Sequence, residues 1–147
     1  MALIERAAIV RLPLADCFAC FANPSLLPQL TPPSLRFTCL PPFRDAIHHG
    51  CEIDYTITWY GVRLAWRTRI VEYDPPHRFV DVQIRGPYRS WWHEHRFTSM
   101  QNHTLMVDRI EYELPFGAVG ALAEPLVRRS LRGILDYRGE VIRRIGG

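Results

Sequence analysis

The chain contains no lysine, so arginine alone supplies its 18 basic residues, and the net charge is +3. Guanidinium groups bind phosphate well, and a surface rich in arginine would suit a nucleic acid. Here, however, the arginines form no basic run and alternate with acidic residues along the chain. The sequence therefore predicts no nucleic-acid partner, and a codon bias towards arginine in the source genome explains the composition.

Long apolar runs are also missing, since none approaches the roughly 20 residues that a membrane-spanning helix needs. Residues 1–6 become polar too early to form the core of a signal peptide. We therefore expect a cytoplasmic protein without stable membrane insertion. The chain has no phosphate-binding glycine loop, no GxSxG elbow and no zinc-finger spacing, which argues against phosphoryl transfer and serine hydrolysis.

The four cysteines give little sign of redox or metal chemistry. Cys17 and Cys20 have the spacing of a redox motif, but such a motif follows a strand and opens a helix in a parallel βαβ unit, and these surroundings differ. No second pair completes a zinc site. We expect buried structural thiols and no cofactor.

At 147 residues, the chain fits one domain (residues 1–147), long enough to bury a core or enclose a cavity. The pattern predicts a strand over 2–12, a short helix over 13–21 and another helix that begins at Asn23-Pro24. Alternation and turn residues then predict strands over 51–59, 62–71, 79–85, 88–98 and 104–114.

A helical period occupies the rest of the chain. The residues that recur with this period are all apolar except Ser130: Leu122, Leu126, Ser130, Ile134, Val141 and Ile145. Pro125 either kinks this helix or marks its first turn, in which case residues 118–124 form a separate turn.

Alternation also sorts the strand residues into two faces. The outer face carries charges of both signs, which can pair across strands: Glu52, Asp54, Arg63, Arg67, Arg69, Glu94, Arg96, Arg109, Glu111 and Glu113. The inner face is aromatic and apolar with four polar groups: Ile53, Tyr55, Ile57, Trp59, Leu64, Trp66, Trp91, His93, His95, Phe97, Met106, Asp108, Ile110 and Tyr112. One long helix over a broad curved sheet leaves space, and apolar pockets with a few polar groups are typical small-molecule sites.

This order of elements resembles the START-like superfamily, also called SRPBCC or polyketide cyclase/dehydrase and lipid transport. The local similarity to its small bacterial members lies in residues 72–79 (EYDPPHRF), 86–88 (GPY), 92–97 (WHEHRF), 104–108 (TLMVD) and 112–117 (YELPFG). The resemblance implies an α+β helix-grip fold: a curved antiparallel sheet of about seven strands wrapped around a long C-terminal helix, with two short helices after the first strand. It also implies a cavity for a hydrophobic small molecule, but it separates carriers from enzymes poorly.

His93 and His95 are two residues apart on a strand, so both rings project from the same face. Asp108 on the next strand could orient one imidazole. A metal would need a third ligand, and the other histidines, at 48, 49, 77 and 103, fall in predicted loops, so we expect no metal. A structural polar network is the leading interpretation, and acid/base catalysis is the alternative.

We expect the protein to carry or sense a lipid, isoprenoid or polyketide-like compound. The predicted ligand-binding residues are Tyr55, Trp59, Trp66, Trp91, His93, His95, Met106, Asp108, Tyr112 and Phe116. The alternative is a cyclase or dehydratase in which His93 or His95 transfers a proton and Tyr112 polarises a carbonyl. Phe116 is expected to plug the point where helix meets sheet, in a region that gates the cavity of related folds. A protein-interaction role and the oligomeric state stay open.

Overall fold

The computed structural model describes residues 1–43 and 45–145, apart from the side chain of Ile145. Within this part of the chain, seven strands form one antiparallel sheet in the order β1-β7-β6-β5-β4-β3-β2. The strands are β1 (Ala2–Val10), β2 (Thr38–Cys39), β3 (Glu52–Trp59), β4 (Val62–Asp74), β5 (Arg78–Arg85), β6 (Ser90–Met100) and β7 (His103–Glu113). The helices are α1 (Leu14–Phe21), the 3-10 helices η1 (Pro24–Leu30) and η2 (Pro33–Leu35), and α2 (Gly117–Ile145).

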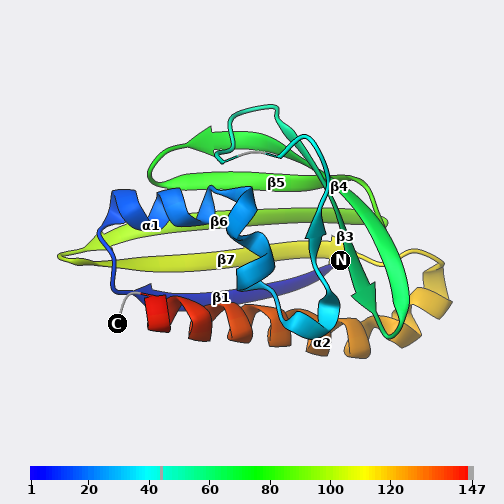
Figure 1. The fold of residues 1–147 in the computed structure, drawn as a ribbon. Helices are drawn as coiled ribbons and strands as arrows, with labels where there is room; N and C mark the ends of the chain where they lie inside the picture. Colours follow the sequence, from blue (N-terminus) through cyan, green and yellow to red (C-terminus); the bar gives the residue numbers. More distant parts are fainter. Residues whose placement is uncertain (44, 146–147) are drawn as a thin grey trace.

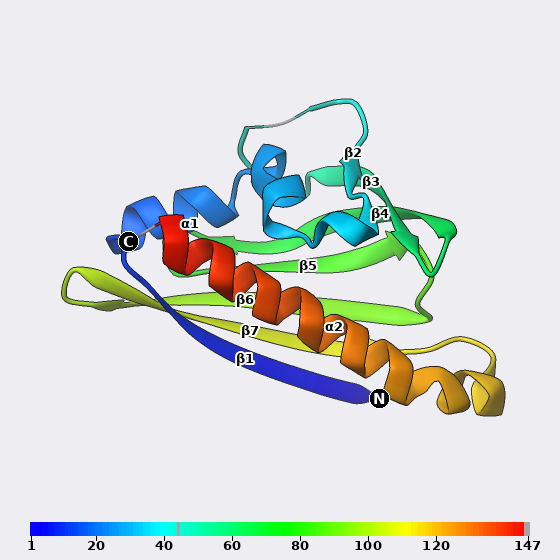
Figure 2. The ribbon, with the colours of Figure 1, turned by 60° about the horizontal axis from the view of Figure 1, so that its bottom comes forward.

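The helices all lie on one side of the curved sheet (Figures 1 and 2). Helix α2 crosses the sheet, and α1 with the 3-10 helices covers the part that α2 leaves open. The register between β4 and β5 shifts at Arg67/Thr68 and at Ile70/Glu72, and such irregularities bend a sheet. The predicted helix-grip arrangement is confirmed.

Local sequence explains the ends of several elements. Asn23 caps η1, because its side-chain oxygen accepts a hydrogen bond from the backbone N–H of Ser25 at 3.0 Å. Tyr60 and Gly61 both have positive φ, the geometry of the tight turn that joins hairpin strands such as β3 and β4. On the outer face, Asp54 lies opposite Arg67 and accepts a hydrogen bond from it at 2.8 Å, as the alternation predicted.

Two packed clusters hold the helices on the sheet. The first surrounds α1, where Phe18 packs edge-on against Phe79 and Phe97, with ring centroids 5.7 and 5.2 Å away. The second joins Trp66 and Trp91 of the sheet to Leu131 and its neighbours on α2. Helix α2 reaches both clusters, since Ile142 near its C-terminal end packs in the first and Leu131 in the second.

Helix α2 differs from the expectation in phase. Its buried apolar side chains are Val127, Leu131, Leu135 and Ile142, each one residue after a position of the predicted stripe. Leu122 is 84% exposed, since the first turns of α2, orange in Figure 1, extend past the ends of β1 and β7. The helix begins at Gly117, so the alternative of a separate turn over 118–124 is wrong and Pro125 lies within the helix.

The four cysteines differ in their burial. All four cysteines are free; Cys17 and Cys51 are buried, whereas Cys20 and Cys39 are only partly buried, so the expectation of buried thiols holds for two of them.

In the described part of the chain, no helix is both long enough and apolar enough to cross a bilayer.

Candidate functional site

A cavity of about 500 Å³ lies between the inner face of the sheet and α2. Its wall comes from every layer of the fold, because strands β3 to β7, the 3-10 helices and α2 all contribute side chains. Most of these are aliphatic or aromatic: Phe21, Leu27, Leu35, Phe37, Ile47, Ile53, Tyr55, Ile57, Trp59, Leu64, Trp66, Ile70, Phe79, Tyr88, Trp91, Ile110, Leu114, Val127, Leu131, Ile134 and Leu135. The cavity therefore favours an apolar occupant.

An aromatic wall forms one side of the cavity. Tyr55 stacks on Trp66 with ring centroids 5.6 Å apart, and Trp66 meets Trp91 edge to face at 5.1 Å. Tyr88 fills the angle between the two indoles, 5.3 Å from Trp66 and 4.8 Å from Trp91. Because each ring is held by its neighbours, the wall is preformed.

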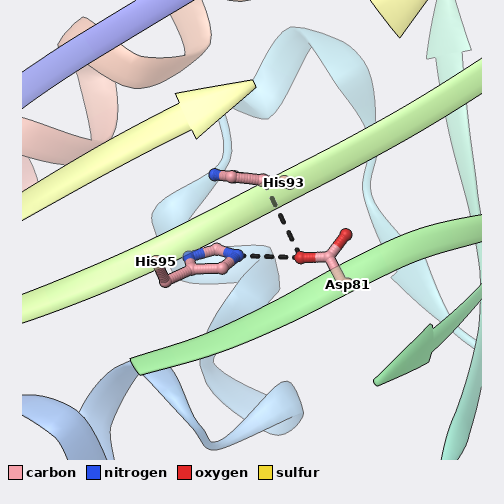
Figure 3. A group of neighbouring side chains, drawn as sticks. All are labelled: Asp81, His93 and His95. Atoms are coloured by element: carbon pink, nitrogen blue, oxygen red, sulfur yellow. Dashed lines mark hydrogen bonds and ion pairs between the residues drawn. The ribbon is translucent and has the colours of Figure 1, made fainter. Parts of the chain in front are cut away.

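Four charged or polar side chains form a cluster in the middle of the sheet, which we call the His–Asp cluster: Asp81 on β5, His93 and His95 on β6, and Asp108 on β7. His95 Nε2 lies 2.8 Å from Asp81 Oδ2, and His93 Nε2 lies 2.8 Å from Asp108 Oδ1. The other ring nitrogens face the opposite carboxylates, with His93 Nδ1 3.8 Å from Asp81 and His95 Nδ1 3.4 Å from Asp108. Each carboxylate thus contacts both imidazoles (Figure 3 shows the contacts of Asp81).

The backbone and stacked rings fix this cluster. In the strand register, Asp81 is directly opposite His93, and His95 is directly opposite Asp108. The 2.8 Å contacts are therefore the diagonal ones, a distance that long side chains on neighbouring strands can span. The His95 ring is sandwiched between His93 at 3.8 Å and Phe79 at 4.1 Å, which sets its orientation.

Burial and charge act differently on the two imidazoles. Burial, with the neighbouring His95, lowers the pKa of His93 below its ordinary value. Burial also acts to lower the pKa of His95, but the carboxylates of Asp108 and Asp81 outweigh it and raise that pKa. The pKa of Asp108 is held far below its usual range, because its contacts with His93 and His95 outweigh its burial. The pKa values of the two imidazoles are therefore shifted in opposite directions, downward for His93 and upward for His95.

Unpaired donors line the same cavity. Nε1 of Trp66 and Nε of Arg138 are buried and make no hydrogen bond with any residue that the structure describes. Arg138 projects from α2 towards the cluster, and its NH1 lies 3.6 Å from Asp108 Oδ1. A buried donor without a partner is unfavourable, so an occupant with an acceptor atom would be stabilised here.

The structure brings seven of the ten predicted ligand-binding residues to the cavity: Tyr55, Trp59, Trp66, Trp91, His93, His95 and Phe116. Met106, Asp108 and Tyr112 lie outside the set of lining residues. Met106 packs in the cluster around α1, and Asp108 sits behind the imidazoles, as the expected contact with His93 requires. The Tyr112 hydroxyl donates to Glu124 of α2 at 2.6 Å and so cannot polarise a carbonyl in the cavity.

The expectation that Phe116 plugs the junction of helix and sheet is wrong. Its side chain is 82% exposed at the rim of the cavity. Phe116 and Gly117 both have positive φ, which turns the chain sharply between β7 and α2 and leaves the ring in solvent.

Besides several apolar lining residues such as Tyr88, two charged residues of the site were missed from the sequence. Asp81 lines the cavity and completes a group with His93 and His95 whose ligand atoms all lie within 4.8 Å of one another. This supplies the third candidate metal ligand that the histidines in loops did not. Arg138 was also missed, although it follows Ser130 and Ile134 at four-residue steps and so shares their face of the helix.

Comparison with known proteins places this architecture. A family model described as polyketide cyclase / dehydrase and lipid transport matches residues 10–136. No curated protein matches the chain. Among solved structures, protein Ms6760 from Mycobacterium smegmatis is similar with a TM-score of 0.72 and 18% identity, over 97% of this chain and 89% of that one.

Two further structures show the same fold. A START superfamily protein from Mycobacterium smegmatis has a TM-score of 0.73 at 9% identity, over 97% of this chain and 98% of that one. Ginseng major latex-like protein 151 from Panax ginseng has a TM-score of 0.73 at 13% identity, over 99% and 97%.

Proposed function

Since the chain belongs to the polyketide cyclase/dehydrase and lipid transport family, we propose that it binds a hydrophobic small molecule in the cavity between sheet and α2. The occupant is a lipid, an isoprenoid or a polyketide-like compound that the protein carries or senses. The proposal concerns binding, and it requires no chemical step.

The observation that carries the proposal is the cavity itself. A volume of about 500 Å³ falls within the range of about 300–1,000 Å³ that is usual for small-molecule sites. Its wall is apolar over most of the lining residues, and burial of apolar ligand surface contributes roughly 25 cal/mol per Å² before the costs of association.

The polar groups of the wall favour a ligand with one polar end. His95, Asp81 and Arg138 lie together on the wall, whereas the neighbouring aromatic wall offers mainly the unpaired Nε1 of Trp66. A ligand with a single carbonyl or hydroxyl group could meet these donors while its apolar body fills the rest. Such an arrangement fixes the orientation of the ligand rather than supplying most of its affinity.

Native mass spectrometry of the protein purified from its own host, followed by solvent extraction, tests the proposal. We expect an adduct of a few hundred daltons with one ligand per chain, and an apolar extract. Ile57→Trp introduces bulk into the cavity and should abolish the adduct, because Ile57 lines it. Ile84→Trp is the matched control, since Ile84 is an exposed residue of the same sheet and lies outside the lining set.

Two outcomes would contradict binding in the cavity. One is a ligand-free mass for the wild-type protein that persists after incubation with lipids, quinones and polyphenols. The other is an adduct that Ile57→Trp leaves unchanged while Ile84→Trp removes it.

A cyclase or dehydratase remains the alternative, and a substitution of His95 addresses it. The ring nitrogens nearest the carboxylates are engaged, and the hydroxyl of Tyr112 is held by Glu124, so the geometry supports it less than binding. With His95→Gln, a carrier should keep most of its affinity. An acid/base enzyme would also keep the ligand, but its turnover would fall by about 100-fold or more.

A further inference from the structure

We propose that Asp81, His93 and His95 form a binding site for a divalent transition-metal ion of the zinc type, with its open coordination positions facing the cavity. Zinc sites of this kind use two imidazoles, one carboxylate and an exchangeable fourth ligand. The inference concerns the same cavity as the proposed function but does not depend on the binding of an apolar ligand.

The ligand atoms of Asp81, His93 and His95 lie close together. Asp81 Oδ2 lies 2.8 Å from His95 Nε2 and 3.8 Å from His93 Nδ1, and the three ligand atoms lie within 4.8 Å of one another. Figure 3 shows dashed lines that join Asp81 to both imidazoles; the two rings are stacked with an interplanar angle of 26°, so they would have to tilt for both nitrogens to reach one ion. Tetrahedral coordination with bonds of about 2.0–2.2 Å places ligand atoms roughly 3.3 Å apart. Each of the two measured separations would have to change by only about half an ångström to meet that value.

A lone pair of His93 faces Asp81. Asp108 accepts at His93 Nε2, so that nitrogen carries the hydrogen in a neutral ring. The lone pair of His93 then lies on Nδ1, which faces the carboxylate of Asp81. Two acceptors that face each other across 3.8 Å repel unless a cation lies between them.

Asp108 holds the ring of His93 from the side away from Asp81. Ligating histidines usually donate their second ring N–H to a carboxylate, which fixes the tautomer and raises ligand basicity. Asp108 occupies this place for His93, at 2.8 Å, whereas His95 Nδ1 lies 3.4 Å from Asp108 without a hydrogen bond to any residue that the structure describes. Arg138 lies 3.6 Å from the same oxygen and balances its charge. The nitrogen of His93 that faces Asp81 is thus available, whereas His95 Nε2 donates to Asp81 at 2.8 Å and would have to release this hydrogen when an ion binds.

The three residues are accessible from the cavity. Asp81, His93 and His95 all line the cavity, so an ion there could take water or an oxygen atom of an occupant as its remaining ligand. Imidazole and carboxylate donors suit zinc and its neighbours in the first transition row more than Ca²⁺ or Mg²⁺, which prefer oxygen ligands. An occupant with a carboxylate, a hydroxyketone or a diketone end would be favoured.

Titration of chelator-treated full-length protein with Co²⁺ and Zn²⁺ tests the site without any organic ligand. We expect one ion per chain by calorimetry. With Co²⁺ we also expect a visible absorption band and quenching of the fluorescence of Trp91, whose Nε1 lies 3.3 Å from Asp81 Oδ1. Asp81→Asn should weaken binding by more than about 100-fold. Asp108→Asn should weaken it by about 10–100-fold, since Asp108 only orients the ligands.

The control is the double variant His48→Gln/His49→Gln, which removes two exposed neighbouring histidines and should bind as the wild type does. The proposal fails if the wild-type protein shows no saturable binding, or if binding is lost in this control and kept in Asp81→Asn. Should Asp81→Asn not fold, X-ray absorption of the wild-type protein with Zn²⁺ decides. Two imidazoles in the first coordination shell are expected, and a shell of sulfur or of oxygen alone would refute the site.

Failure of this proposal and failure of the proposed function can be told apart. Adduct formation is measured on protein kept in chelator, and metal binding is measured on protein extracted with solvent and refolded to its native circular dichroism spectrum. An apolar adduct without metal binding refutes the metal site alone.

Discussion

Replacing Asp108 by asparagine tests whether the His–Asp cluster and Arg138 act as one charge-balanced unit. The side chain of Asp108 is 3% exposed and that of Arg138 is 11% exposed, so water screens neither well. Asparagine keeps the size and one acceptor oxygen but removes the negative charge. The guanidinium group of Arg138 then stays buried without the carboxylate that faces it.

The expected cost follows from the distance between the two groups. Charges 3.6 Å apart interact by about 4–5 kcal/mol at an effective dielectric constant of about 20. This agrees with the roughly 3–5 kcal/mol lost when one partner of a buried ion pair is removed. For a chain of this size, the melting temperature should fall by roughly 6–20 °C, at about 2–4 °C per kcal/mol.

Urea denaturation followed by tryptophan fluorescence measures this loss. Adding Arg138→Met removes the unpaired cation, so the double variant should be more stable than the sum of the two single changes implies. Asp136→Asn, in an exposed ion pair with Arg6, is the control and should cost only about 0–1 kcal/mol. A cost below about 1 kcal/mol for Asp108→Asn, or strict additivity in the double variant, would refute the reasoning.

Two further outcomes are expected. Phe18→Ala should cost about 3–5 kcal/mol in urea denaturation, because its ring is buried against Phe79 in the packed cluster around α1; a cost near 1 kcal/mol would mean that α1 packs loosely. Burial acts to raise the pKa of Glu94, but hydrogen bonds from Arg78 and a second arginine outweigh it and lower that pKa. The stability that Glu94 supplies should be fully present above its unfolded pKa of about 4.3 and be lost as the pH falls through its lower folded pKa, so Glu94→Gln should flatten the acid limb of a pH–stability curve; parallel curves would contradict this.

The sheet could be predicted because its signals are local. The alternation in residues 52–59 and the turn at Tyr60-Gly61 each depend on a few neighbouring residues, and both are present in the structure. The predicted strand 62–71 is longer in the structure, ending at Asp74, because pairing with β5 continues past the bulge at Ile70/Glu72. Strand pairing thus extended an element that the sequence pattern ended early.

The site was harder to predict because it reverses the usual polarity. On β5, Val80 and Val82 alternate with Asp81 and Gln83, so period alone would direct the valines to the interior and Asp81 to water. In the structure, Asp81 faces the cavity, while Ile84 on the opposite face is exposed. Both faces of this strand carry buried apolar residues, Val80 on one and Phe79 on the other, so alternation alone does not identify the face that lines the cavity.

The place of the His–Asp cluster in the sheet bears on what it can do. β6 is paired on both sides, with β5 and with β7, so the four side chains are held by two hydrogen-bonded registers rather than by loops. A polar group that enters the cavity therefore meets charges that need little reorganisation, which is what a selective binding or metal site requires. Because each carboxylate contacts both imidazoles and the imidazoles stack on each other, a change at one of the four residues alters the contacts of at least two others. The unit responds as a whole, and single substitutions in it should be non-additive.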